Sequence, residues 1–185
     1  MPLYALGEKR PRIHPSAWIH PTAVLIGDVW VDAEASIWPN VVIRADNSPI
    51  RIGARSSVQD GSVLHTTPWA PTTIGADCVI GHLVHLEGCT LEDLVLIGSN
   101  AVVLEEAVCR SGSLVGASSV VTIGREVPAG ALAVGVPAKI KPDAVDPERI
   151  RLNVQAYLDH LREHRDGMRE LDLDQCLAED VFPAG

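Results

Sequence analysis

The chain has 185 residues, enough for one domain with a core and at most a small appendage. Its formal net charge is −9, and this excess of negative charge argues against nucleic acid and acidic membranes as partners. No apolar run is long enough to span a membrane, and the N-terminus lacks the apolar stretch of a signal peptide. We therefore expect a soluble protein of the cytoplasm.

A period of six residues runs along most of the chain. Steps of six from Ile13 land on aliphatic residues as far as Ile43, where residues 46–51 interrupt the pattern. A second interruption, HTTPWAPT, precedes Ile74, and the steps then continue to Ala133 with one residue missing. Neither an amphipathic helix nor an alternating strand gives a sustained period of six, whereas a hexapeptide repeat does.

Each hexad is a short strand followed by a turn, with its first residue pointing inward and a small fifth residue at the bend. Three such strands form one triangular coil, and stacked coils bury the aliphatic column of each face. The sequence therefore predicts an all-β fold, a left-handed parallel β-helix of hexapeptide repeats with about seven coils, over residues 1–140.

The pattern changes after Lys139. Apolar residues then recur at helical spacing from Ile150 to Leu161, with charged residues between them. We expect residues 141–171 to hold a C-terminal amphipathic helix packed on the prism, and residues 172–185 to form a loose acidic tail.

Stacking arithmetic places several polar residues. Positions three hexads apart lie above one another, so Arg44, His65 and Glu87 form one column, provided that the two interruptions bulge outward. Asp60 lies beneath His82 on the next face. The two groups cannot meet within one subunit, but they can meet if three prisms pack around a threefold axis. We therefore predict a homotrimer with clefts between subunits.

These residue types suggest a metal site in each cleft. Imidazole and carboxylate are ligands of zinc, and an open fourth position would hold an activated water. The alternative is that the same side chains form a polar network within an interface.

Three segments resemble the γ-class carbonic anhydrase family: IRADNSPIRIGARSSVQDGSVLH, TIGADCVIGH and AVGVPAKI. The resemblance covers about residues 10 to 165. It implies trimers of left-handed β-helices with a metal at each interface, and reversible hydration of CO2 to bicarbonate by metal-bound hydroxide. Two of the family's three histidine ligands match His65 and His82.

The third ligand departs from the family pattern, because position 87 holds Glu87 instead of His. Three interpretations stay open. Glu87 completes a site of two His and one carboxylate; His85, at the corner leading into the strand, swings in; or the metal site is lost. Zinc is the expected metal, with Fe(II) or cobalt as alternatives.

The resemblance also implies roles for other residues. Gln59 would orient the hydroxide or bicarbonate. Arg44, paired to Asp46 and reaching Asp60 of the neighbouring subunit, would mainly fix the interface. Tyr157 either reaches the cleft or packs in the core. Neither interruption carries an added Glu to move protons, so we expect weak activity.

Two other functions remain. Hexapeptide β-helices also serve as acyltransferases that use CoA thioesters and a His base, and GVPAK occurs in those enzymes too. A catalytically silent, metal-bearing scaffold or binding protein would have the same sequence features.

Overall fold

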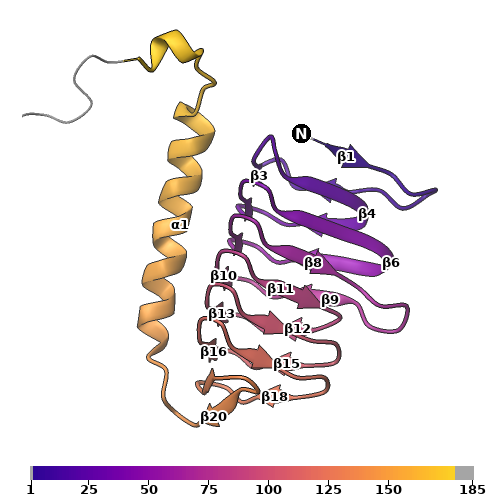
Figure 1. Ribbon diagram of the computed structural model, residues 1–185, viewed down its shortest axis with the longest axis vertical. Coiled ribbons are helices and arrows are strands. Elements are labelled where there is room, and N and C mark those ends of the chain that lie inside the picture. Colours follow the sequence, from indigo (N-terminus) through magenta and orange to yellow (C-terminus); the bar gives the residue numbers. More distant parts are fainter. Residues whose placement is uncertain (1, 178–185) are drawn as a thin grey trace, which may run out of the picture.

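The computed structural model describes residues 2–177 and confirms the β-helix (Figure 1). Short parallel strands stack into about seven left-handed coils, which form a prism with three faces. The long strands β4 (Val24–Val31) and β6 (Val42–Ile52) turn a corner of the prism and therefore belong to two faces.

We name the three faces by what they carry. The valine face consists of β1 (Leu3–Tyr4), the first halves of β4 and β6, β8 (Val63–His65), β11 (His85–Glu87), β14 (Val102–Val103) and β17 (Val120–Val121). The charged face consists of β2 (Arg12–Ile13), the second halves of β4 and β6, β9 (Thr72–Ile74), β12 (Thr90–Leu91), β15 (Val108–Cys109) and β18 (Glu126–Val127). The helix-covered face consists of β3 (Trp18–Ile19), β5 (Ser36–Ile37), β7 (Ser57–Val58), β10 (Val79–Ile80), β13 (Leu96–Ile97), β16 (Leu114–Val115), β19 (Leu132–Val134) and β20 (Lys139–Lys141).

The core is the aliphatic column of each face, as the six-residue period predicts. Ile43 pairs in register with Leu64, and Leu64 pairs with Leu86; all three side chains are fully buried. Small residues at the fifth position, such as Ala23 and Ala35, are also fully buried at the bends. Each coil thus buries its aliphatic side chains against the coils above and below it.

The two interruptions bulge outward and leave the stacking register intact. Gly27 of β4 pairs with Ala45 of β6, and Val29 of β4 pairs with Ile50 of β6. Two residues along β4 therefore correspond to five residues along β6. The extra residues form a loop at the corner between the valine face and the charged face. Gly27 has a φ of +80°, and a Cβ atom there would lie 2.3 Å from the Ala45 carbonyl oxygen.

The C-terminal helix α1 (Pro147–Gly167) lies along the prism and confirms the predicted amphipathic helix (Figure 1). The Asp146 side chain accepts a hydrogen bond from the Glu148 amide and caps its N-terminus. Its buried stripe packs on the helix-covered face and comprises Ile150, Val154, Leu158 and Leu161. A short 3-10 helix, η1 (Leu173–Gln175), follows. Most of the predicted tail, residues 178–185, lies outside the described residues.

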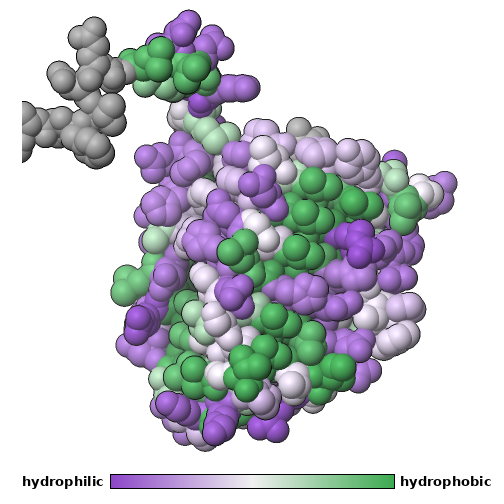
Figure 2. Space-filling view, in the orientation of Figure 1, coloured by the Kyte–Doolittle hydropathy of each residue, from purple (hydrophilic) through white to green (hydrophobic). Residues whose placement is uncertain are grey.

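The three faces differ in what covers them. Helix α1 covers one face, and the second carries charged side chains such as Arg51, Arg110 and Glu126. Valines at outward positions of the third face are only partly buried, namely Val42, Val63, Val102 and Val120. Figure 2 shows apolar side chains gathered in patches over the strands of the prism. Over residues 2–177, no helix is long and apolar enough to cross a membrane.

Candidate functional site

A column of polar side chains interrupts the valine face. Arg44 of β6 pairs in register with His65 of β8, and His65 pairs with Glu87 of β11. The three residues therefore occupy equivalent positions in successive coils, as the stacking arithmetic predicts. The coils are about 4.8 Å apart, which brings the side chains of His65 and Glu87 into contact.

A chain of hydrogen bonds links the column. His65 Nδ1 lies 3.1 Å from Glu87 Oε1, and His65 Nε2 lies 3.1 Å from Asp46 Oδ1. Glu87 Oε2 lies 3.3 Å from His85 Nε2, while Arg44 donates to the Asp46 carboxylate. Two carboxylates and two imidazoles are thus gathered on one face.

His85 does not lie at a corner, so this part of the prediction is wrong. It is the first residue of β11 and pairs in register with Val63 and Val102. Alternate residues of a strand share a face, so His85 and Glu87 project from the same side and contact each other. No swing of His85 is needed to bring it to the site.

Nearby charges favour the ionised carboxylates. Hydrogen bonds from His65 and His85 hold the pKa of Glu87 below its ordinary value and outweigh the opposing effect of burial. Burial raises the pKa of Asp46, but the adjoining Arg44 guanidinium and the His65 contact outweigh it, so that the net shift is downward. The cluster therefore presents two carboxylates at neutral pH.

A second pair lies at the corner between the helix-covered face and the valine face. His82 Nδ1 is 2.8 Å from Asp60 Oδ2, and nearly half of each side chain is exposed. The adjacent Gly61 has a φ of +69°, and a Cβ atom there would lie 2.6 Å from the Leu83 side chain. Asp60 lies beneath His82 as predicted, because their strands β7 and β10 are neighbours.

Gln59 and Tyr157 lie close to that corner. The Gln59 side chain is buried at the end of β7. The Tyr157 ring packs edge to face on Trp38, with 5.7 Å between ring centroids. Burial raises the pKa of Tyr157, and the charge of Asp60 raises it further. Tyr157 thus packs against Trp38 on the helix-covered face.

The donor set suits zinc in kind, since it consists of imidazole nitrogens and carboxylate oxygens. Over residues 2–177 of one chain, however, no three His, Cys, Asp or Glu side chains are arranged to hold a metal ion. His82 is separated from the column by the corner of the prism. A single chain therefore carries two separate polar groups, the column with His65 and Glu87 and the pair of His82 with Asp60.

The sequence did not predict the contact between Asp46 and His65. Asp46 belongs to the first interruption, where the repeat gives no register, so neither period nor spacing could place its side chain. The resemblance pointed to Asp46 only as the partner of Arg44.

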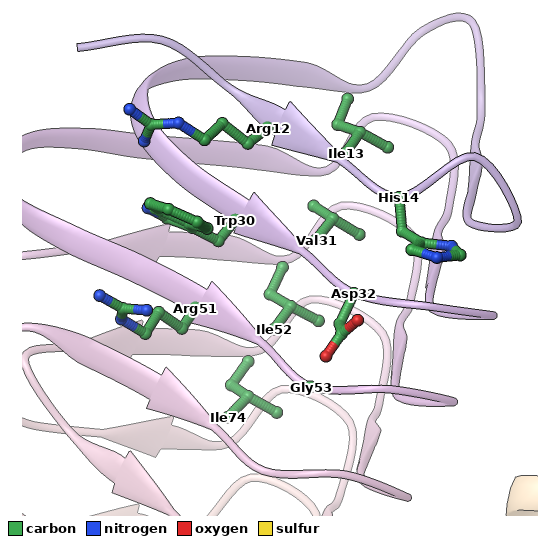
Figure 3. Close-up of a pocket in the computed structure, with 10 residues that line it drawn as sticks. All are labelled: Arg12, Ile13, His14, Trp30, Val31, Asp32, Arg51, Ile52, Gly53 and Ile74. Atoms are coloured by element: carbon green, nitrogen blue, oxygen red, sulfur yellow. The ribbon is translucent and has the colours of Figure 1, made fainter.

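A separate hollow of about 430 Å³ lies on the charged face. Figure 3 shows Arg12, Trp30 and Arg51 in a row along one side of it. The two guanidinium carbons lie 4.3 and 5.1 Å from the Trp30 ring centroid, so both are stacked on the indole. Asp28 is hydrogen-bonded to Arg12 and to the Trp30 indole. The residues that line the hollow do not include any member of the column.

Comparison with known proteins places the chain in a family. No model of a protein family matches it. The carnitine operon protein CaiE of Salmonella agona is 36% identical over 172 residues, which are 92% of this chain and 87% of CaiE. The mitochondrial gamma carbonic anhydrase 2 of Arabidopsis thaliana is 28% identical over 182 residues, covering 92% of this chain and 66% of that protein. The chain belongs to the γ-carbonic anhydrase-like family.

The family includes proteins described in different ways. A solved Bacillus cereus protein, provisionally described as an acetyltransferase, shares 36% identity and a TM-score of 0.86 with this chain. The match covers 90% of this chain and 98% of the solved protein. Membership of the γ-carbonic anhydrase-like family confirms the resemblance. It does not decide between CO2 hydration and acyl transfer, because the similar proteins carry both descriptions.

Proposed function

We propose that the protein is a metal-dependent enzyme of the carbonic anhydrase type, which hydrates CO2 reversibly in clefts between the subunits of a homotrimer. The observation that carries the proposal is the pairing of His65 with Glu87 in register, within a polar column on a face whose other outward residues include Val42, Val63, Val102 and Val120. His82, held by Asp60 at the adjoining corner, is the complementary half.

The valine face supports the trimer. Apolar side chains at its outward positions surround the polar column, and one of them, Val63, is 38% exposed in a single chain. An exposed apolar face of this kind is typical of a surface that binds another protein. A neighbouring copy that covers the face brings its own corner, with His82 and Asp60, toward the column.

The proposed ligands are His65 and Glu87 or His85 of one copy and His82 of its neighbour. Asp60 accepts at His82 Nδ1, which fixes the imidazole and leaves Nε2 free, the arrangement usual for zinc-binding histidines. Both nitrogens of His65 lie near carboxylate oxygens, Nδ1 near Glu87 and Nε2 near Asp46, so a metal bound by His65 would replace one of these two contacts.

When bound, the metal supplies Lewis acidity that makes water nucleophilic near neutral pH. Gln59, at the base of the same corner, presents an amide that can orient CO2 or bicarbonate. Arg44 and Asp46 fix the edge of the cleft by their mutual ion pair. A carboxylate ligand lowers the net positive charge at the metal, so we expect slower turnover than a site of three histidines gives.

Complementation between two inactive variants tests the proposal. His65→Ala and His82→Ala should each lose zinc and CO2 hydration, because each removes one half of every cleft. Co-expression of the two variants should restore roughly a quarter of the clefts, since random mixing pairs the two intact halves in that fraction of interfaces. The matched control is co-expression of two differently tagged His65→Ala chains, which cannot recover.

Mixed trimers that form without regaining zinc would refute the shared site. Zinc without CO2 hydration would instead favour the metal-bearing scaffold. The second enzymatic candidate is acyl transfer, which the description of the Bacillus cereus structure supports. An increase in Tm on adding CoA, together with turnover of a CoA thioester that survives the loss of zinc, would favour that function.

A further inference from the structure

The N-terminal segment, residues 3–9, lies outside the hexapeptide period and contacts the candidate site. Strand β1 adds to the end of the valine face by pairing in parallel with β4. The chain then reverses at Gly7, whose φ is +61°, and an antiparallel bridge joins Leu6 to Lys9. This reversal directs the Lys9 side chain toward the loop that begins at Asp46.

The Lys9 ammonium binds two consecutive carbonyl oxygens of that loop. Lys9 Nζ lies 2.7 Å from the Asp46 oxygen and 2.8 Å from the Asn47 oxygen, and the side chain is partly buried. Within residues 2–177, no carboxylate forms an ion pair with Lys9. The Lys9 ammonium therefore interacts with the main chain of the loop. Such charge-assisted hydrogen bonds are stronger than neutral ones.

The opposite side of the loop is held by the next coil. Asn47 Nδ2 donates to the Thr66 carbonyl oxygen at 3.1 Å, and Ser48 Oγ donates to the Thr67 carbonyl oxygen at 2.9 Å. The Ser48 amide donates to Thr66 Oγ1. Hydrogen bonds thus hold the loop to the N-terminal segment on one side and to the second interruption on the other. Lys9 donates those on the N-terminal side.

The position of this loop decides the position of the Asp46 carboxylate. The loop contains residues beyond the β-helix register, so strand pairing does not fix Asp46. Its carboxylate nonetheless reaches His65 Nε2 and Arg44. We infer that Lys9 is a positioning residue of the site, which holds the Asp46 main chain so that the Asp46 carboxylate orients the His65 imidazole.

The inference rests on the proposed function for its meaning in catalysis, but the contacts do not depend on a metal. Outer partners of a ligating histidine set the orientation of its ring, and their loss typically costs about 10- to 100-fold in metal affinity. Lys9 does not contact His65 but acts on it through Asp46, so we expect the loss of Lys9 to lower zinc affinity by about tenfold, the lower end of this range.

The test compares three full-length variants. Lys9→Met keeps the length of the side chain but cannot donate, whereas Lys9→Arg keeps the charge and can still reach two carbonyl oxygens. Lys139→Met is the matched control, because Lys139 is exposed in β20 and its ammonium forms no hydrogen bond to a described residue. Each variant is measured for amide hydrogen exchange in residues 46–48, for the ring ¹⁵N signals of His65, and for zinc affinity by chelator competition.

Lys9→Met should accelerate exchange in residues 46–48, shift the His65 ring signals and weaken zinc binding, and Lys9→Arg should restore most of each. Lys139→Met should match the wild type. Unchanged loop exchange and His65 signals in Lys9→Met would overturn the inference. If no variant binds zinc, the metal proposal fails, while the exchange and ring signals still decide the role of Lys9.

Discussion

Replacing Glu87 tests whether it is the third ligand. Glu87 accepts hydrogen bonds from His65 at 3.1 Å and from His85 at 3.3 Å. A hydrogen bond to a charged group contributes about 1.5–3 kcal/mol. Solvent weakens these bonds because 31% of the Glu87 side chain is exposed. We therefore expect Glu87→Gln to lower the free energy of unfolding by about 1–2 kcal/mol, and Tm by about 2–8 °C.

The effect on zinc should separate a ligand from a mere neighbour. Glu87→Gln should weaken zinc binding by more than the roughly 10- to 100-fold, or about 1.4–2.7 kcal/mol, that the loss of a mere outer partner costs. Glu87→His should strengthen it, because the shared site then holds three imidazoles. It should also raise the rate of CO2 hydration, since the neutral ligand leaves more positive charge at the metal.

Chelator competition and thermal unfolding, with and without zinc, measure both effects. Glu106→Gln is the control, because Glu106 is exposed and forms no ion pair within the described residues. The reasoning is refuted if Glu87→Gln binds zinc like the wild type and Glu87→His binds it no more tightly. His85 would then become the candidate third ligand.

Three further predictions concern the assembly, the core and the response to acid. Val102→Asp should convert the trimer to monomers in light scattering, because it places a charge on the valine face; a trimer that persists would remove that face from the interface. Leu64→Ala should cost about 2–5 kcal/mol in chemical denaturation, since Leu64 is fully buried between two coils; a neutral effect would contradict the stacked core. The lowered pKa values of Asp46 and Glu87 stabilise the protein above their ordinary pKa values, so stability should fall as the pH drops through the lowered values. Urea midpoints below about pH 4.5 should therefore fall less steeply for Glu87→Gln than for the wild type.

The fold was predictable because its period is local and repeated. A step of six residues keeps Ile43, Leu64 and Leu86 in one column once the interruptions are treated as bulges, and the strand register confirms it. The same arithmetic places His65 beside Glu87. In a stack of regular coils, residues that lie one coil apart in the sequence are neighbours in space.

Residues outside the period could not be placed in this way. Asp46 reaches His65 from a loop that adds residues to one coil, and Lys9 reaches that loop from a segment before the first hexad. His85 was assigned to a corner because the exact limits of β11 were unknown. Loop conformation and the exact ends of a strand depend on contacts with other coils, which no short window of sequence contains.

The sequence by itself determined the β-helix, the C-terminal helix and the two groups of polar residues, because repeated burial of aliphatic side chains leaves one way to stack the hexads. Only the tertiary structure decided how those polar groups connect: the chain from Asp46 through His65 and Glu87 to His85, and the separate bond from His82 to Asp60. Hydrogen bonds depend on atomic positions within a few tenths of an ångström, and these positions are set by loops and corners that lie outside the repeat.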